Sequence, residues 1–367
     1  MELDPRRTTG ASVKFSRPAQ GRPRRRALIA LAASATALIG AAMLSGFHAE
    51  LHDIDPAGSD RASELTTTER IGIRTWTVAT GITVEPDITY GTREDGTRLD
   101  LDVCSPASDP APGETRVGIV SIHGGSWARG DKSNDDWRHV CQWLASEGFV
   151  AFSVNYRLVP TVHFPAAIDD VGLAVEWVRA HAEDYGIDAA RIGAFGGSAG
   201  GNLAALLGTR GEGPLDSGSR VAAVAELSGP IDLTDAAMQA SGAGELVERI
   251  ALNYLGCDRL ADCPQAADAS ATTFIDPSDP PVFIGHSEGE FIPLGQSTLF
   301  SEALSDAGVA NTMQVIPGVG HSIGILDDAM RTKVADFFRA TLAPPVVTDA
   351  APAVDATPTT AAPLAAG

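Results

Sequence analysis

The chain has 367 residues and a formal net charge of −20 at pH 7. The first 26 residues hold eight of its basic side chains, so the remainder carries 19 Lys and Arg against 45 Asp and Glu, a net charge of −26. Such an acidic surface repels nucleic acid and anionic lipid, so we expect no nucleic-acid partner.

The N-terminal region, residues 1–49, is predicted to be a signal peptide or an N-terminal anchor. Its basic stretch precedes 21 uncharged residues, 27–47. That order is typical of secretory signals, and about 20 apolar residues are enough to span a bilayer. Because the run is rich in Ala, Gly, Ser and Thr, cleavage is favoured over anchoring. We therefore expect a secreted or cell-envelope protein, whose membrane contact is confined to this segment if it remains uncleaved.

The next region, residues 50–84, is interpreted as a linker or a cap segment, and residues 85–342 as the folded domain. Within that domain, alternating apolar and polar residues on both sides of Asp95-Gly96 predict an antiparallel hairpin. Short runs with few polar residues then predict buried parallel strands at 117–122, 149–154, 191–195, 221–227, 281–285 and 312–316.

Helical patterns separate these strands. Apolar residues spaced three and four apart, or continuous helix-forming stretches, predict helices at 135–146, 166–185, 199–208, 296–307 and 327–342. Strand and helix in alternation predict an α/β fold with a mostly parallel, doubly wound sheet. Residues 232–278 interrupt the alternation and are interpreted as a small lid-like insertion. The Ala/Pro/Thr-rich tail, residues 343–367, is predicted to be disordered.

The four cysteines predict disulfide bonds, because their number is even and the chain is expected to be exported. Cys257 and Cys263 lie six residues apart in a loop-like segment, which suits a local bridge. Cys104 and Cys141 either pair or stay as buried thiols. No His or Cys pair stands near them at zinc-ligand spacing, so we expect no metal site.

The motif G-x-S-x-G occurs twice, around Ser198 and around Ser287. A nucleophilic serine of this kind needs a tight turn between a strand and a helix, so that its hydroxyl projects from the sheet. Ser198 has that setting, because RIGAF precedes it as a strand and AGGNLAALLG follows it as a helix. Ser287 does not, because Pro293 soon follows and too little chain remains for an acid and then a histidine. We therefore predict Ser198 as the nucleophile.

A second glycine motif, HGGSW at residues 123–127, follows the strand predicted at 117–122. Glycines at such a position let backbone N–H groups approach a reacting carbonyl oxygen. We expect the N–H groups of Gly124, Gly125 and Ala199 to form an oxyanion hole. Trp127 and Phe164 are candidates for the substrate pocket, with a purely structural core position as the alternative for both.

These motifs resemble the esterase/lipase branch of the α/β-hydrolases, nearest to hormone-sensitive-lipase-like esterases and to bacterial acetyl and feruloyl esterases. The resemblance covers roughly residues 85–342. It is carried by HGGSW with GDK after it, NYRL at 155–158, FPAAIDD at 164–170, YGIDAARIGAFGGSAGGNLA at 185–204 and PVFIGHSEGEFIPLGQSTLFSEAL at 281–304. It implies that the ring of His123 braces the glycine loop.

The general base and its acid partner are expected in loops at the carboxyl edge of the sheet. Of the eight histidines, only His321 has both that position and the order in which this fold places its base. The loop that supplies the acid in the family usually contains HG, two residues, Asp, a short apolar stretch and then Pro. Here it contains His286, Glu288, Glu290 and Pro293. Glu290 matches best by its distance from His286, although it stands one residue nearer the proline than usual, and Glu288 is the rival.

Together these features predict an exported serine carboxylesterase that hydrolyses small to medium esters through an acyl-enzyme and needs no cofactor. The expected partner is a small-molecule ester, and the likeness to acetyl and feruloyl esterases suggests acylated polysaccharide. Two alternatives stay open: an exported amidase or peptidase of the same fold, and a catalytically silent binding protein on this fold.

Overall fold

The computed structural model describes residue 77 and residues 80–344. The predicted signal or anchor (1–49), nearly all of the predicted linker (50–84) and the tail beyond residue 344 lie outside these residues. The first three residues of the first strand, β1 (Ile82–Thr92), fall within the predicted linker. Within the described part, no helix is both long and apolar enough to cross a bilayer.

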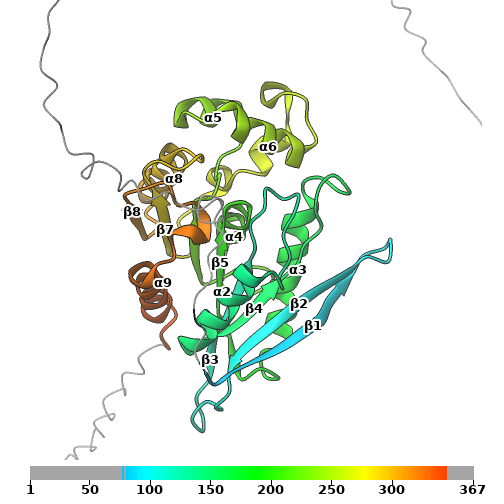
Figure 1. Ribbon diagram of the computed structural model, residues 1–367, viewed down its shortest axis with the longest axis vertical. Helices are drawn as coiled ribbons and strands as arrows, with labels where there is room; N and C mark the ends of the chain where they lie inside the picture. The colour runs from blue at the N-terminus through cyan, green and yellow to red at the C-terminus, as the bar shows by residue number, and fades with distance from the viewer. Residues whose placement is uncertain (1–76, 78–79, 345–367) are drawn as a thin grey trace, which may run out of the picture. The chain divides into compact units, whose positions relative to one another are not determined.

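An eight-stranded sheet forms the centre of the fold, in the order β1-β2-β4-β3-β5-β6-β7-β8 (Figure 1). The strands after β1 are β2 (Arg98–Pro106), β3 (Arg116–Ile122), β4 (Val150–Val154), β5 (Ile187–Gly197), β6 (Ala223–Leu227), β7 (Val282–Ser287) and β8 (Asn311–Ile316). The β1–β2 and β2–β4 pairings are antiparallel, and all pairings from β4 to β8 are parallel. The predicted α/β-hydrolase fold, with its N-terminal hairpin, is confirmed.

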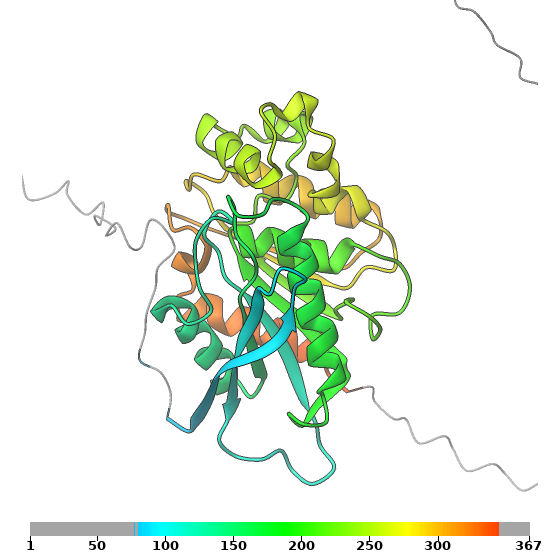
Figure 2. The ribbon, with the colours of Figure 1, turned by 90° about the vertical axis from the view of Figure 1, so that its right-hand side faces the viewer.

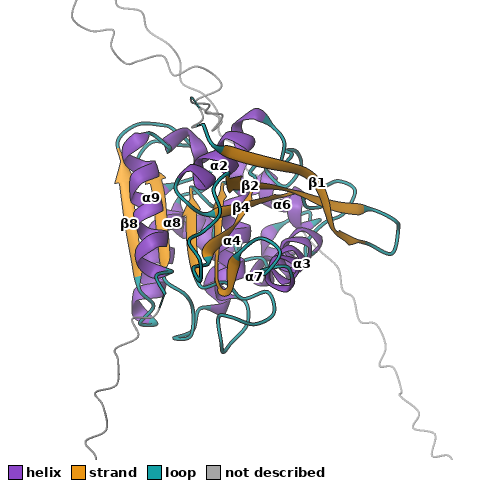
Figure 3. Ribbon diagram, turned by 90° about the horizontal axis from the view of Figure 1, so that it is seen from below, coloured by secondary structure: helices purple, strands orange, loops and turns teal. Residues whose placement is uncertain are grey.

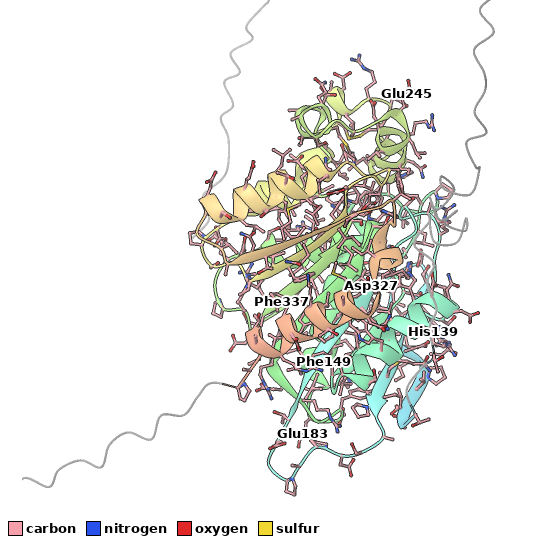
Figure 4. The ribbon with its side chains drawn as sticks, turned by 60° about the vertical axis from the view of Figure 1, so that its left-hand side comes forward. His139, Phe149, Glu183, Glu245, Asp327 and Phe337 are labelled. Atoms are coloured by element: carbon pink, nitrogen blue, oxygen red, sulfur yellow. A yellow bond between two sulfur atoms is a disulfide. The ribbon has the colours of Figure 1, made fainter. Side chains whose placement is uncertain are left out.

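Helices cover both faces of the sheet (Figure 3). One apolar core lies under α2 (Asp135–Ser146) and α9 (Asp328–Thr341). The other lies under α3 (Ala166–Ala180), α4 (Ala199–Thr209) and α8 (Leu294–Asp306). Asp327, labelled in Figure 4, caps α9 by accepting a hydrogen bond from the Met330 amide at 2.8 Å.

Residues 232–278 form the insertion between β6 and β7. Its helices, α5 and α6 among them, lie beyond one end of the strands (Figures 1 and 2). Its helices are short: α5 (Asp235–Ser241), α6 (Glu245–Leu255), η1 (Leu260–Asp262), α7 (Gln265–Asp268) and η2 (Ala271–Phe274). Apolar side chains of α6 reach into the core, among them Val247, Ala251 and Tyr254. The insertion is therefore packed onto the domain rather than hanging free.

The structure places the four cysteines in two pairs at disulfide distance. Cys257 lies next to Cys263 within the insertion, and this is the pair for which the spacing suggests a local bridge. Cys104, in β2, pairs with Cys141, in α2. The second pair lies between the second strand of the sheet and a helix that packs on it.

Candidate active site

Ser198 stands between the last residue of β5 and the first residue of α4. Its backbone angles, φ 57° and ψ −126°, are a conformation that non-glycine residues rarely adopt. The chain turns this sharply only because its neighbours are small: a Cβ on Gly200 would lie 2.1 Å from the carbonyl oxygen of Ile122. A strained strand-to-helix turn is the setting that exposes a nucleophilic serine above a sheet.

Ser287, the serine of the other G-x-S-x-G motif, has a different setting. It is the last residue of β7, its side chain is fully buried, and its hydroxyl donates a hydrogen bond to the carbonyl oxygen of Gly320. Packing of this kind indicates a structural serine.

The glycine loop after β3 lies against the Ser198 turn. A Cβ on Gly124 would lie 3.2 Å from the Cβ of Ser198. Gly125 has φ 125°, and a Cβ there would lie 2.1 Å from the carbonyl oxygen of Arg129, so only glycine fits. Ala199 is the first residue of α4, where backbone N–H groups have no partner within the helix. The three residues expected to form an oxyanion hole thus gather around Ser198.

His123 braces this loop from behind. Its Nδ1 lies 2.8 Å from the carbonyl oxygen of Gly124, and its ring stacks on Tyr156 with 4.4 Å between centroids. The Tyr156 hydroxyl donates to the carbonyl oxygen of His123 at 2.8 Å. Burial lowers the pKa of His123 to about 4, so the ring is neutral at pH 7. A neutral, buried ring with two anchors is suited to fixing a loop rather than to moving protons.

His321 and Glu290 form a direct pair. His321 precedes the short helix η3 (Ser322–Ile325), and its Nδ1 donates a hydrogen bond to Oε2 of Glu290. Both side chains are buried, at 4% and 0% exposure. A carboxylate on Nδ1 fixes the imidazole tautomer that leaves Nε2 free to accept a proton. Glu288, the rival acid, is exposed.

Two further residues hold Glu290 in place, and neither was expected from the sequence. The Ser228 hydroxyl donates to Oε1 of Glu290 at 2.5 Å and accepts the N–H of Ser322 at 3.0 Å. The same hydroxyl therefore contacts the acid and the residue next to the base. Its backbone has φ 56°, so the loop after β6 is turned to place it there.

His286 is the other support. The Ser297 hydroxyl donates to its Nδ1 at 2.8 Å, so the ring proton lies on Nε2. That Nε2 faces the carbonyl oxygen of Ile292 at 3.0 Å and Oε1 of Glu290 at 3.2 Å. Burial lowers the pKa of His286, which favours this neutral form. In the sequence, the place of His286 four residues before Glu290 marked the acid loop but not this contact.

A second carboxyl, Glu226, is fully buried in β6 beneath the Ser198 turn. Its Oε2 accepts the N–H of Gly229 at 2.8 Å, and a Cβ on Gly201 of α4 would lie 3.2 Å from the same oxygen. Its Oε1 has no hydrogen-bond partner within the described part of the chain. Burial, with a smaller contribution from the charge of Glu290, raises the pKa of Glu226 to about 8. Glu226 is therefore a neutral acid at pH 7.

The proton held by the Glu226 carboxyl makes the free energy of unfolding depend on pH. The folded chain keeps it up to about pH 8, whereas the unfolded chain releases it near its ordinary pKa of 4.5. The contribution of Glu226 to stability should therefore fall as pH rises between these two values, by up to about 1.4 kcal/mol per pH unit. Above about pH 8 it should change no further. Glu226→Gln removes the titration, so its Tm relative to wild type should rise steadily from pH 5 to pH 8. Exposed Glu288→Gln is the control, and a pH-independent offset for Glu226→Gln would contradict the assignment.

Two cavities meet at Ser198. The larger, of about 560 Å³, is lined in part by Gly124, Gly125 and His321. The smaller, of about 10 Å³, is lined in part by Trp127 and Ala199. Trp127 thus borders the smaller cavity.

Phe164 borders neither cavity. It packs edge-on against Tyr254, which stacks in turn on Trp127, so it supports the wall from behind. The alternative given for Phe164, a structural position in the core, fits this packing. No cluster of metal-binding side chains occurs among residues 80–344.

Comparison with known proteins identifies related sequences. The sequence model of the BD-FAE family matches residues 101–304, more than half of the chain. Esterase LipQ of Mycobacterium tuberculosis is 30% identical over 237 residues, which are 62% of this chain and 55% of LipQ. Ethyl acetate hydrolase of Pseudomonas putida is 30% identical over 255 residues, covering 64% of this chain and 74% of that protein. The chain spans about half the length of the mycobacterial relatives LipQ and LipC.

Solved structures are similar as well. A truncated carbohydrate esterase from gut microbiota superposes with a TM-score of 0.60 at 26% identity, covering 71% of this chain and 96% of that one. Esterase 2 of Thermogutta terrifontis superposes with a TM-score of 0.57 at 27% identity, covering 72% and 93%.

Proposed function

The chain belongs to the BD-FAE family of α/β-hydrolases, and we propose that it is a serine carboxylesterase acting on small to medium carboxylic esters. The observation that carries the proposal is the hydrogen-bonded pair of His321 and Glu290, with His321 and Ser198 lining one cavity. The chain order of serine, acid and histidine is the order this fold uses. The esterases named above support the same reaction class.

The proposed reaction is acyl transfer in two steps. His321 takes the proton of Ser198 while Glu290 stabilises the imidazolium, and the serine oxygen attacks the ester carbonyl. The N–H groups of Gly124, Gly125 and Ala199 stabilise the negative charge on the carbonyl oxygen. His321 then gives its proton to the departing alcohol. Water, activated by the same histidine, releases the acid and restores Ser198.

The first test is hydrolysis itself, with p-nitrophenyl acetate and p-nitroacetanilide as matched ester and amide. We expect the ester to be cleaved and the purified chain to be labelled by a fluorophosphonate, because both require an activated serine. Faster cleavage of the anilide would replace the esterase with an amidase. The absence of both cleavage and labelling would leave a binding protein on this fold.

We also propose that the protein is exported, from the basic and then apolar order of residues 1–49. The two cysteine pairs at disulfide distance are compatible with an oxidising compartment. N-terminal sequencing of exported material should give a start between about residue 41 and residue 50. Recovery of the full-length chain in membranes would favour the anchor instead.

A further inference from the structure

The two cavities at Ser198 differ greatly in size while sharing a border. Both are lined by Ser126, Ser198, Ile250 and Phe291. One measures about 560 Å³ and the other about 10 Å³. An ester bound at Ser198 has two arms, the acyl group and the alcohol, and they leave the carbonyl carbon in different directions. The site therefore offers very unequal room to the two arms.

The walls of the small cavity belong to the packed core. Trp127 is 1% exposed, and its ring is stacked on Tyr254 with 4.0 Å between centroids and 4° between planes. Val247 of α6 and Leu233 are also buried. Close-packed interiors resist expansion, because an added methylene forces side chains and backbone to shift. The small cavity has room for about one water-sized sphere, about 10–15 Å³, which accommodates one methyl group and little more.

Proton transfer decides which arm enters which cavity. The histidine that activates Ser198 must later protonate the departing alcohol, so the alcohol has to lie on the histidine's side of the carbonyl. The oxyanion donors do not decide the assignment, because Gly124 and Gly125 line the large cavity and Ala199 lines the small one. His321 lines the large cavity and not the small one. The alcohol therefore occupies the large cavity and the acyl group the small one.

We infer that Val247 and the Trp127–Tyr254 stack are specificity-determining residues, which limit the acyl group to about the size of acetate while the large cavity accepts a bulky alcohol. This inference rests on the proposed esterase function. The large cavity also indicates the alcohol. Leu246 and Phe291, exposed by 49% and 40%, give it an apolar side, whereas Arg129, Asn134 and Asp136 give it a polar side. An alcohol that combines an apolar face with hydroxyl groups matches both sides.

The test is a series of p-nitrophenyl esters from acetate to octanoate, in which only the acyl arm changes. For the wild-type chain, kcat/KM should fall at least about tenfold from acetate to butyrate, as the loss of room for a methylene predicts. Val247→Ala enlarges the small cavity and should raise the butyrate-to-acetate ratio by about tenfold. Leu246→Ala is the matched control on the same helix, because Leu246 lines only the large cavity, and it should leave that ratio unchanged.

A second series keeps acetate constant and enlarges the alcohol, from ethyl acetate to 1-naphthyl acetate and peracetylated xylose. Along this series we expect kcat/KM to be maintained or to rise. Leu246→Ala removes apolar surface from the large cavity and should therefore lower kcat/KM for the bulkier acetates. A flat or rising acyl series for the wild type would overturn the inference while leaving an esterase, even if Val247→Ala fails to fold. No cleavage of any ester and no fluorophosphonate label would instead overturn the proposed function.

Discussion

Ser198→Ala should abolish ester hydrolysis, lowering kcat by about 10⁶-fold, the loss typical when a nucleophilic serine is removed from an intact site. It should also abolish fluorophosphonate labelling, since the reagent reacts with the activated hydroxyl. The fold should persist, because alanine removes one oxygen at a position that borders two cavities rather than the core. Measuring kcat, labelling and Tm on one preparation separates lost chemistry from lost folding.

The matched control is Ser287→Ala, which changes the serine of the other G-x-S-x-G motif. Its hydroxyl is buried and donates to the carbonyl oxygen of Gly320, so the variant should lose about 1–3 kcal/mol of stability. Labelling and most of the activity should remain at a temperature where it is folded. A fluorophosphonate-labelled peptide that contains Ser287 would show that the assignment of the two motifs is wrong.

The sequence predicted most of the fold, because buried parallel strands appear as apolar runs and five of the helices have clear patterns. Helix α2 begins and ends where expected, at Asp135–Ser146. Helix α3 ends at Ala180, five residues before the expected end at 185. There the N–H of Ile187 bonds the carbonyl oxygen of Ala182, which turns the chain into β5. Element ends depend on such tertiary contacts, which a hydrophobic pattern does not contain.

The residues around the acid were harder to predict, because they are joined only by folding. Ser228 and Glu290 lie 62 positions apart, and no pattern links a serine after one strand to a glutamate after the next. Asp170 shows the same difficulty. It falls within the first turns of the helix predicted at 166–185, where nothing in the pattern indicates a special role, yet its carboxylate is fully buried and pairs with Arg93 and Arg157. Polar side chains whose partners are distant in sequence give no periodic signal.

The other large effect is expected at the acid: Glu290→Gln should lower kcat by about 10³–10⁴-fold while the fold persists. The glutamate accepts from His321 through Oε2 and from Ser228 through Oε1. A glutamine with its NH₂ toward His321 would force Nδ1 to accept, which leaves the proton on Nε2 and blocks its role as base. If the amide of the glutamine were flipped, its NH₂ would instead face Ser228 and His286, which are themselves donors. Neither orientation restores an imidazole that is both correctly protonated and electrostatically supported.

Glu288→Gln, two residues away, is the matched control and should change kcat by less than about tenfold, because an exposed carboxylate adds only a screened field. This pair of variants matters because the loop reaches Pro293 one residue earlier than the family pattern. Measured together with Tm, they separate three arrangements. A severe loss only in Glu290→Gln supports the pair with His321, and a severe loss only in Glu288→Gln would reverse the two roles. Mild losses in both, with Ser198 and His321 still essential, would mean that the imidazole works without a carboxylate partner from this loop.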